Sequence, residues 1–383
     1  MTITAQAIEK DLTELWKSDP REKTKDLGLQ RVCTTNLVVY ASDHEEGYRA
    51  EQIMNDLAEK HPGRYILIRP AADTSEAPLR HYVSGHCFFG AGREKKVCCD
   101  LIKLVAQREV IENLYGFTFS LLMPDLPVEF WWPGSLPAQN VFFDKMADQA
   151  GRVWVDSSKF DDPIQSLARL SAFWHSRYPH TLLGDLNWIR IQRWRALIAE
   201  LFDGEWAKFL KDVKSVNIAY GAGTQPTRSV FLACWLASQL DWKYKGKRIS
   251  VFLNPSSGSA GPSGRVINLD FEGPQGKVEV VLTPVPVRDI KLDRIFAVGL
   301  TTEGKQPAIF TVIRDEDPHL VTVRSEINQK VAFSRTVSFE HHHSNELLTL
   351  GMKHLEPDLV WKKTLQMVGT DLEKPDLTSM GQK

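Results

Sequence analysis

The chain has 383 residues, of which 43% are hydrophobic, and its 47 basic side chains nearly balance its 48 acidic ones. At about 150 residues per domain, this length predicts two domains, or one large domain with an appendage, with enough apolar material for a core. The net charge of -1 excludes a strongly basic nucleic-acid binder and an acidic tail as properties of the whole chain.

The sequence predicts neither a secretory signal nor a membrane span. Residues 1–10 lack a positively charged leader followed by an apolar core, which is the pattern of a secretory signal. The longest apolar runs fall far short of the roughly 20 residues needed to cross a bilayer. We therefore expect a cytoplasmic protein with no membrane and no nucleic-acid partner.

The first elements predict a parallel sheet. Residues 1–28 are polar around a weak helical pattern, which predicts a docking helix or a loose tail. A compact β run at 35–40, a helix at 45–60 capped by Asp43, and a β run at 64–69 then form a strand-helix-strand unit.

The next elements surround an unusual segment. Two strands are expected at 81–89 and 96–105, and a helix at 108–122. Residues 123–137 carry four prolines and one glycine, which predicts an irregular loop holding a Phe-Trp-Trp run.

The remaining elements predict a change of architecture near residue 242. Helical and β patterns alternate up to a strand at 215–220 and a buried helix at 228–240. Repeated β runs separated by Gly, Pro and Asp turns then indicate an antiparallel meander, followed by two helices. The predicted fold is an N-terminal α/β domain with a mostly parallel or mixed sheet and an antiparallel β-meander domain with C-terminal helices. The expected limits are 1–28 for the polar segment, 29–241 for the α/β domain and 242–383 for the β domain.

The five cysteines predict inert thiols. Their odd number and the lack of a Cys-x-x-Cys pair or a secretion signal argue against a disulfide framework and a zinc site. Cys98 and Cys99 are neighbours on a predicted strand, so they point to opposite faces and are poorly placed to bond each other.

Three segments resemble cofactor or metal sites without completing them. The run 221–226 follows a strand and precedes a helix but ends in Pro226 where a dinucleotide loop needs its third glycine, so an ordinary turn is favoured. The Gly- and Ser-rich run 256–264 lacks the Gly-Lys-Ser/Thr ending of a phosphate loop. The histidines at 341–343 have no recognisable partner motif nearby. We predict no metal and no cofactor.

No catalytic signature is recognisable, and we assign no catalytic residue. Asp156 and Ser157 follow a predicted strand, where α/β folds often bind ligands. They are candidates for ligand contacts, but a role in capping or tying the loop is favoured.

Three segments together resemble a known family. They are the Pro-Asp-Leu-Pro-Val-Glu-Phe-Trp-Trp-Pro-Gly run at 124–134, the Asp-Leu-Asn-Trp-Ile-Arg-Ile-Gln-Arg-Trp-Arg run at 185–195, and the Cys-Trp-Leu-Ala-Ser-Gln-Leu-Asp-Trp run at 234–242. In this order and approximate spacing they are similar to the OpcA family, the glucose-6-phosphate dehydrogenase assembly proteins of cyanobacteria and actinobacteria. The runs 31–39 and 61–64 also look like that family's opening.

The resemblance implies a non-catalytic protein that assembles or allosterically activates glucose-6-phosphate dehydrogenase, the source of NADPH in the oxidative pentose phosphate pathway. In cyanobacterial relatives the activation is linked to thioredoxin, although the five cysteines do not match a family redox pair. Trp and Arg often anchor protein interfaces. The interface candidates are Phe130, Trp131, Trp132, Pro133, Arg190 and Arg193. For Trp131 and Trp132, packing in the core is an equal alternative, whereas Trp174 and Trp194 are expected in the core.

A second hypothesis is an α/β enzyme or a sugar-phosphate-binding sensor that uses the carboxyl edge of the first sheet. Asp156, Ser157, Arg190 and Arg193 would then contact the ligand, because arginine forks suit phosphate.

Overall fold

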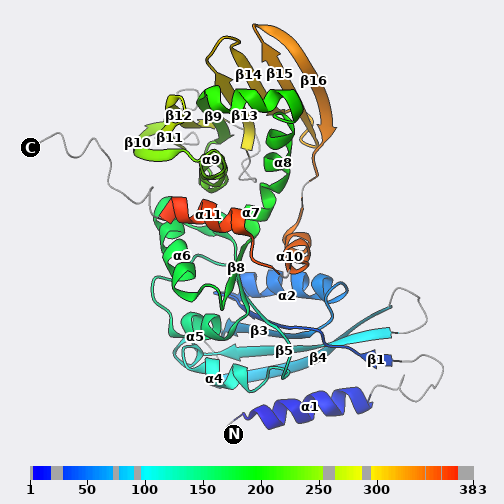
Figure 1. Ribbon diagram of the computed structural model, residues 1–383. Coiled ribbons are helices and arrows are strands. Elements are labelled where there is room, and N and C mark those ends of the chain that lie inside the picture. Colours follow the sequence, from blue (N-terminus) through cyan, green and yellow to red (C-terminus); the bar gives the residue numbers. More distant parts are fainter. Residues whose placement is uncertain are drawn as a thin grey trace, which may run out of the picture. The chain divides into compact units, whose positions relative to one another are not determined.

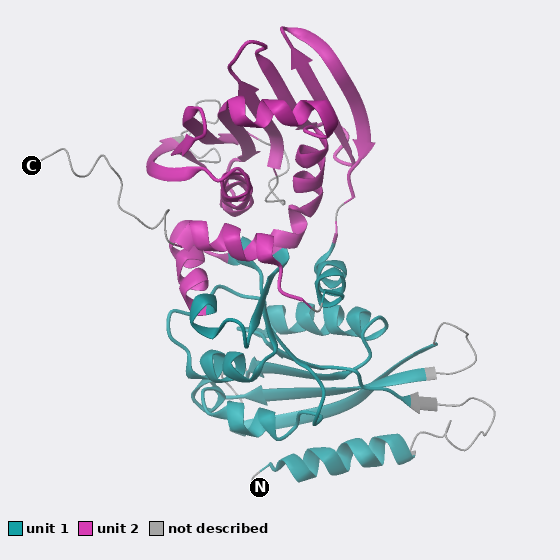
Figure 2. Cartoon of the chain, viewed as in Figure 1, with its two compact units in different colours: residues 1–159, 174–186, 343–355 teal, residues 160–173, 187–342, 356–383 magenta. Residues whose placement is uncertain are grey.

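The structure is a computed structural model that describes residues 3–18, 29–71, 77–89, 96–252, 264–286, 295–340, 342–354 and 356–369. The chain divides into two compact units (Figure 2). The first contains residues 1–159, 174–186 and 343–355, and the second contains residues 160–173, 187–342 and 356–383. None of the described helices is both long and apolar enough to span a membrane.

The first unit is built on a mixed sheet of eight strands. The strands are β1 (Leu29–Arg31), β2 (Asn36–Tyr40), β3 (Arg64–Pro70), β4 (Leu79–Phe89), β5 (Lys96–Ala106), β6 (Val128–Trp132), β7 (Arg152–Val155) and β8 (Leu182–Asp185). All neighbours are parallel except β4, which pairs antiparallel with β5. This confirms the predicted mostly parallel or mixed sheet.

The order of the parallel strands reverses in the middle of this sheet. The spatial order is β5-β3-β2-β6-β7-β8, so the chain builds outward from β2 on one side and then returns to its other side at β6. In doubly wound sheets, ligands bind outside the carboxyl ends of the strands at such a reversal. The ends of β2 and β6 are therefore where this fold would place a site.

The structure corrects the expectation of an irregular loop at 123–137, because residues 128–132 form the central strand β6. Pro127 and Pro133 flank the strand and do not enter it, and the five residues between them are mostly β-branched or aromatic. The side chain of Asn36 on β2 fixes the chain before the strand, accepting from the Met123 backbone N–H (2.8 Å) and donating to the Met123 carbonyl (3.0 Å). Prolines thus border a regular strand where the sequence predicted a loop.

Helices cover both sides of the first sheet. They are α1 (Ala5–Ser18), α2 (His44–Ala58), α3 (Arg108–Ile111), α4 (Leu114–Phe119), α5 (Val141–Gln149) and α10 (Ser344–Met352). Figure 1 shows α2 and α1 on opposite sides of the strands, with α2 packed on β3, α10 on α2, and α1 on β4. The single helix expected at 108–122 is two short helices, α3 and α4. A further helix, α6 (Pro163–Arg177), contributes residues to both units.

The amino-terminal segment contains a docked helix. Ile8 and Leu12 of α1 are fully buried, and the Trp16 ring lies against Gly85 of β4, where an added Cβ would come within 2.6 Å of it. This supports the docking-helix alternative for residues 5–18.

A buried ionic network joins α1 to the sheet. Asp100 of β5 is 0% exposed and accepts from Arg64 of β3 (2.9 and 3.1 Å), from Arg31 Nε of β1 (2.8 Å) and from Trp16 Nε1 (3.2 Å). Arg64, which is 2% exposed, also pairs with Glu9 of α1 and donates to the Leu121 carbonyl (2.7 Å). The central carboxylate thus has charged and hydrogen-bonding partners from three different elements.

The structure corrects the expectation of free thiols at Cys87 and Cys98, which form a disulfide across the β4–β5 hairpin. The two residues stand directly opposite each other in the register, with Cα atoms 4.1 Å apart. The expected strands at 81–89 and 96–105 are consecutive, and their antiparallel pairing is what places Cys87 opposite Cys98. Cys99 remains a buried free thiol, as expected, and burial raises its pKa to about 11, which keeps it protonated.

The second unit is built on another eight-stranded sheet. Its strands are β9 (Val213–Gly221), β10 (Lys243–Phe252), β11 (Gly264–Gly273), β12 (Gly276–Val285), β13 (Ile295–Thr302), β14 (Ala308–Arg314), β15 (Leu320–Ile327) and β16 (Lys330–Ser338). The order is β10-β11-β12-β9-β13-β14-β15-β16, and only β9 with β12 is parallel. The predicted meander is confirmed on both sides of β9, which was expected in the first domain but inserts here between β12 and β13.

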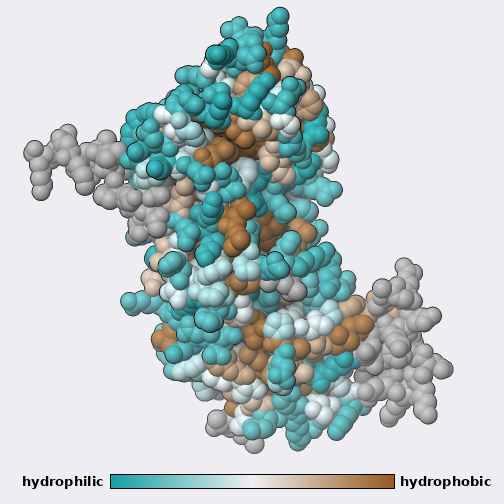
Figure 3. All heavy atoms as spheres, in the orientation of Figure 1, coloured by the Kyte–Doolittle hydropathy of each residue, from teal (hydrophilic) through white to brown (hydrophobic). Residues whose placement is uncertain are grey.

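One face of this second sheet is covered by helices. The strands are contacted by α8 (Gln192–Glu200), the 3-10 helix η3 (Gly204–Asp212) and α9 (Thr227–Gln239). The helix α11 (Leu359–Met367) packs on α9, and the short helix α7 (Leu186–Arg190) precedes α8. Burial alternates along the strands: Phe310 and Val312 of β14 are fully buried, whereas Ile309 and Ile313 are 44% and 43% exposed. Figure 3 shows hydrophobic patches interrupting a largely hydrophilic surface on the face in view.

The units differ from the expected domain limits. α8, β9 and α9 belong to the second unit, and α10 belongs to the first, although both sets were expected on the other side of residue 242. α10 is held in the first unit because Arg152 of β7 donates to the carbonyls of Gly351 (3.2 Å) and His354. The division into units does not test whether residues 29–241 and 242–383 fold independently, so the boundary at 241 stays a prediction.

Candidate functional site

The candidate site is the carboxyl edge of the first sheet, where the strand order reverses between β2 and β6. Residues 41–43 lead from β2 into α2, and residues 133–135 follow β6. In a dinucleotide-binding protein of this topology, the turn after the first strand is glycine-rich and the following helix N-terminus binds the pyrophosphate. The turn here is Ala-Ser-Asp and contains no glycine.

The start of α2 is already occupied by carboxylates of this chain. Asp43 Oδ1 accepts from the Glu46 backbone N–H (2.8 Å), and Glu46 Oε2 accepts from the Ser42 backbone N–H (2.6 Å). Glu45 adds a third acidic side chain in the same turn. Because these two amide groups are satisfied by carboxylates and the local charge is negative, this helix start disfavours a phosphate.

Asp43→Ala is expected to lower the free energy of unfolding by about 1 kcal/mol at neutral pH, because it removes an N-cap hydrogen bond. That bond holds the pKa of Asp43 below its ordinary value of 3.8. The contribution is therefore present above pH 3.8 and is lost as pH falls through the lower, folded-state pKa. Urea unfolding of both proteins at pH 7 and pH 3 checks this; Glu59→Ala, beyond the other end of α2, is the control. An equal difference at both pH values would contradict the cap.

The aromatic residues of β6 form the core beside this edge. Phe130, Trp131 and Trp132 are 0%, 2% and 5% exposed. The Trp132 ring stacks on Tyr40 of β2 at 4.3 Å and meets Phe143 of α5 edge-on at 5.1 Å, and its Nε1 donates to the Ser135 carbonyl (2.9 Å). This burial supports the core alternative for both tryptophans. Trp174 and Trp194 are also buried, which confirms their predicted place in the core.

Asp156 and Ser157 lie at the same edge, one strand farther along. Asp156 Oδ1 accepts from the Ser158 backbone N–H (3.2 Å) and hydroxyl (2.7 Å), and the Ser157 backbone N–H donates to Asp185 Oδ1 (3.2 Å). Both side chains are buried. The structure therefore supports the loop-tying role for Asp156, whereas the buried Ser157 hydroxyl has no hydrogen-bond partner among the described residues. Ligand contact by these residues stays a prediction.

The other interface candidates are distributed differently. Pro133 follows β6 and is buried, whereas Arg190 and Arg193 belong to the second unit, on α7 and α8. Arg193 is 45% exposed and lies 3.8 Å from Glu200. The arrangement thus brings Trp132, Pro133, Asp156 and Ser157 to one sheet edge, while the arginines stand on another unit.

The three glycine- and histidine-rich segments have separate outcomes. Residues 221–226 form a strand-to-helix turn in which the Thr224 hydroxyl donates to the Gly221 carbonyl (2.7 Å), as favoured from the sequence. Residues 253–263 and His341 lie outside the described residues. Among the described residues, no group of three or more His, Cys, Asp or Glu side chains is arranged to hold a metal ion.

Sequence reasoning missed two features with possible functional weight, the Cys87–Cys98 disulfide and a pocket beneath β16 in the second unit. The disulfide joins residues 11 apart across a hairpin whose two strands the sequence predicts, so antiparallel pairing of those strands is its signal. The pocket has no such signal, because it brings Glu200 to Phe333 and Arg335, which are far away along the chain.

Comparison with known proteins decides the family. Two family models match, the glucose-6-phosphate dehydrogenase subunit N-terminal domain over residues 54–172 and the corresponding C-terminal domain over residues 181–365. The chain belongs to the OpcA family. The resemblance seen in the sequence is thereby confirmed, and the two OpcA domain models together cover most of the chain.

Individual relatives bear the family name. "Putative OxPP cycle protein OpcA" of Nostoc punctiforme is 28% identical over 270 residues, which are 69% of this chain and 55% of that protein. The protein of the same name from Synechococcus elongatus is 24% identical over 332 residues, 85% of this chain and 71% of that protein. The chain thus spans about half the length of the first relative. Among solved structures, myo-inositol dehydrogenase of Lactobacillus casei aligns with a TM-score of 0.46 and 11% identity, covering 91% of this chain and 96% of that one.

Proposed function

We propose that this protein is a non-catalytic assembly factor and allosteric activator of glucose-6-phosphate dehydrogenase in the cytoplasm, serving NADPH production in the oxidative pentose phosphate pathway. The observation that carries the proposal is the match of both halves of the chain to domains described as subunits of that dehydrogenase. The carboxylate-filled start of α2 supports it, because the fold's usual dinucleotide position is closed to a phosphate.

The mechanism requires only differential binding. A protein that binds the active oligomer or conformation of the dehydrogenase more tightly than its alternatives shifts the population toward that state. The balanced charge of the chain disfavours capture by long-range electrostatics and leaves shape and local contacts to provide recognition.

Complex formation tests the proposal directly. The two purified proteins are mixed and passed through size-exclusion chromatography with light scattering, under oxidising and under reducing conditions. The proposal expects a co-eluting complex larger than the dehydrogenase alone. Separate elution of both proteins under both conditions would overturn it.

We further propose that the Cys87–Cys98 disulfide makes this function redox-sensitive, with thioredoxin as the reductant. Thioredoxin's dithiol would attack the disulfide through a mixed-disulfide intermediate, leaving two thiols on this chain and a disulfide on thioredoxin. Cys87 lies on the edge strand β4 and is partly exposed, so one of the sulfur-bearing residues reaches the surface.

Reduction is expected to lower the free energy of unfolding by about 3 kcal/mol, because the cross-link closes a short loop in the unfolded chain. Guanidinium unfolding with and without reduced thioredoxin measures the effect, together with activation of the dehydrogenase. The Cys87→Ser/Cys98→Ser variant should be insensitive to thioredoxin, whereas Cys33→Ser, which alters a free thiol, should respond like the wild type. A thioredoxin effect that persists in the double variant would refute the assignment.

A further inference from the structure

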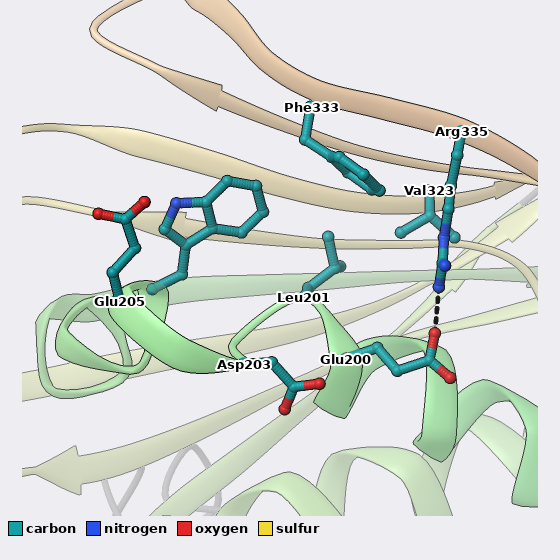
Figure 4. A pocket seen from close by; sticks show the side chains of 8 residues that line it. Glu200, Leu201, Asp203, Glu205, Val323, Phe333 and Arg335 are labelled. Atoms are coloured by element: carbon teal, nitrogen blue, oxygen red, sulfur yellow. Dashed lines mark hydrogen bonds and ion pairs between the residues drawn. The ribbon is translucent and has the colours of Figure 1, made fainter.

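A pocket of about 470 Å³ opens in the second unit beneath the last strand of its sheet (Figure 4). One side is formed by the end of α8 and the start of η3, and the other by β15 and β16. In the strand register, Phe333 and Arg335 of β16 stand opposite Ser325 and Val323 of β15, which are buried. Phe333 and Arg335 therefore extend the helix-covered face of the sheet beyond the covering helices.

The aromatic rings of Trp206 and Phe333 form one wall of the pocket. The Trp206 ring lies 5.8 Å from that of Phe333 at an interplanar angle of 69° and 6.3 Å from that of Phe310. Phe310 is fully buried and packs against Phe202 (4.5 Å) and Phe209 (5.5 Å). Trp206 is thus held by the core while its own side chain remains partly exposed at the pocket.

The charges around the pocket are not balanced. Glu200 is paired with Arg335 across the pocket, as Figure 4 shows, and with Arg193 of its own helix. Asp203 and Glu205 are exposed and form no side-chain ion pair or hydrogen bond with any residue that the structure describes. The Arg335 guanidinium already lies over the Phe333 ring, 5.7 Å from its centroid. Two uncompensated carboxylates and the Trp206 ring therefore remain at the pocket, and both kinds of group attract a cation.

The pocket adjoins an open sheet edge. β16 is the last strand in the sheet order, and within the described part of the chain no strand pairs with its outer edge. Its side chains are mostly exposed, including Val331 at 55%. An edge strand can pair with an extended segment, whose alternate side chains then point to one face of the sheet. On one of these faces they would reach Phe333 and the pocket.

We propose that β16 and this pocket bind an extended segment of a protein partner, with an arginine or lysine side chain lying against the Trp206 ring on the acidic side of the pocket, which carries Asp203 and Glu205. Backbone pairing with β16 provides affinity, and the cation in the pocket provides selectivity. The inference rests on the proposed function only for the partner's identity, which would be the dehydrogenase.

The first test uses the full chain and the peptide Thr-Val-Arg-Val-Thr-amide, labelled with fluorescein on its terminal amine, followed by fluorescence anisotropy. We expect the arginine peptide to bind about tenfold more tightly than its glutamine counterpart and to weaken as salt rises. N-methylation of alternate backbone amides should also weaken binding, because it blocks strand pairing. Equal affinity for the arginine and glutamine peptides would overturn the proposal.

The second test locates the binding. Asp203→Asn/Glu205→Gln should reduce affinity for the arginine peptide about tenfold while leaving its weak binding of the glutamine peptide unchanged. Glu303→Gln/Glu316→Gln removes the same charge from exposed positions on turns of this sheet and should bind like the wild type. Equal losses of affinity in both double variants would overturn the assignment of peptide binding to the pocket.

Binding to the dehydrogenase, measured alongside peptide binding, distinguishes a failure of this inference from a failure of the proposed function. A wild-type chain that binds the peptide but forms no complex with the dehydrogenase supports the pocket and overturns only the proposed function. A complex that forms equally well with wild type and with Asp203→Asn/Glu205→Gln overturns the pocket as the docking position of the dehydrogenase.

Discussion

Replacing Asp100 with asparagine is expected to lower the free energy of unfolding by about 3–5 kcal/mol, because it leaves two arginines without their buried counter-charge. Asp100 is 0% exposed, and Arg64, at 2% exposed, has little access to water. Arg64 would keep only Glu9, which is itself part-exposed, as a charged partner. The loss should fall on the first unit and loosen α1, whose Trp16 donates to the same carboxylate.

Guanidinium unfolding measures the loss, and hydrogen exchange of the α1 amides locates it. Glu45→Gln is the matched control, because it removes one carboxylate from the exposed Arg49–Glu45 pair, where the expected cost is below about 1 kcal/mol. If Asp100→Asn lowers the free energy of unfolding no more than this control does, the network does not hold α1 on the sheet.

Trp132→Ala is expected to destabilise the first unit by about 3–5 kcal/mol, because it opens a cavity between β2 and α5. The ring is 5% exposed, stacks on Tyr40 and contacts Phe143, so its neighbours cannot close the gap without moving a strand or a helix. If Trp132 instead served as an exposed interface anchor, its loss would weaken partner binding at nearly unchanged stability.

Chemical denaturation and dehydrogenase binding, measured on the same variant, distinguish these two roles. Tyr82→Ala, which truncates an aromatic ring that is 52% exposed on β4, serves as control and should cost well under half as much. A Trp132→Ala protein of wild-type stability would contradict its place in the core.

Local sequence patterns predicted most helices and strands, because the residues that mark a helix or a strand lie close together along the chain. Alternating apolar residues defined β11 to β15, and Asp43 marked the start of α2 through an N-cap that the structure contains. Long-range pairing was out of reach for the same reason. β9 reads as an ordinary strand, and nothing in its residues indicates that it inserts between β12 and β13.

The candidate site was predictable in its residues but not in their roles. Proximity to a strand end singled out Asp156 and Ser157, and aromatic content singled out the β6 residues, which lie at the same sheet edge. Whether a side chain is buried decides whether it packs in the core or can contact a partner. Burial cannot be read from amino-acid composition. Asp203 and Glu205 illustrate the converse, since they become notable only when β16 brings Phe333 beside them.

The most direct test of the central claim is the activity of glucose-6-phosphate dehydrogenase titrated with glucose 6-phosphate, with and without a stoichiometric amount of this protein. We expect the protein to lower the half-saturating substrate concentration or to raise the rate at low substrate, while the protein alone turns over nothing. Identical titration curves with and without the protein, under both oxidising and reducing conditions, would contradict it.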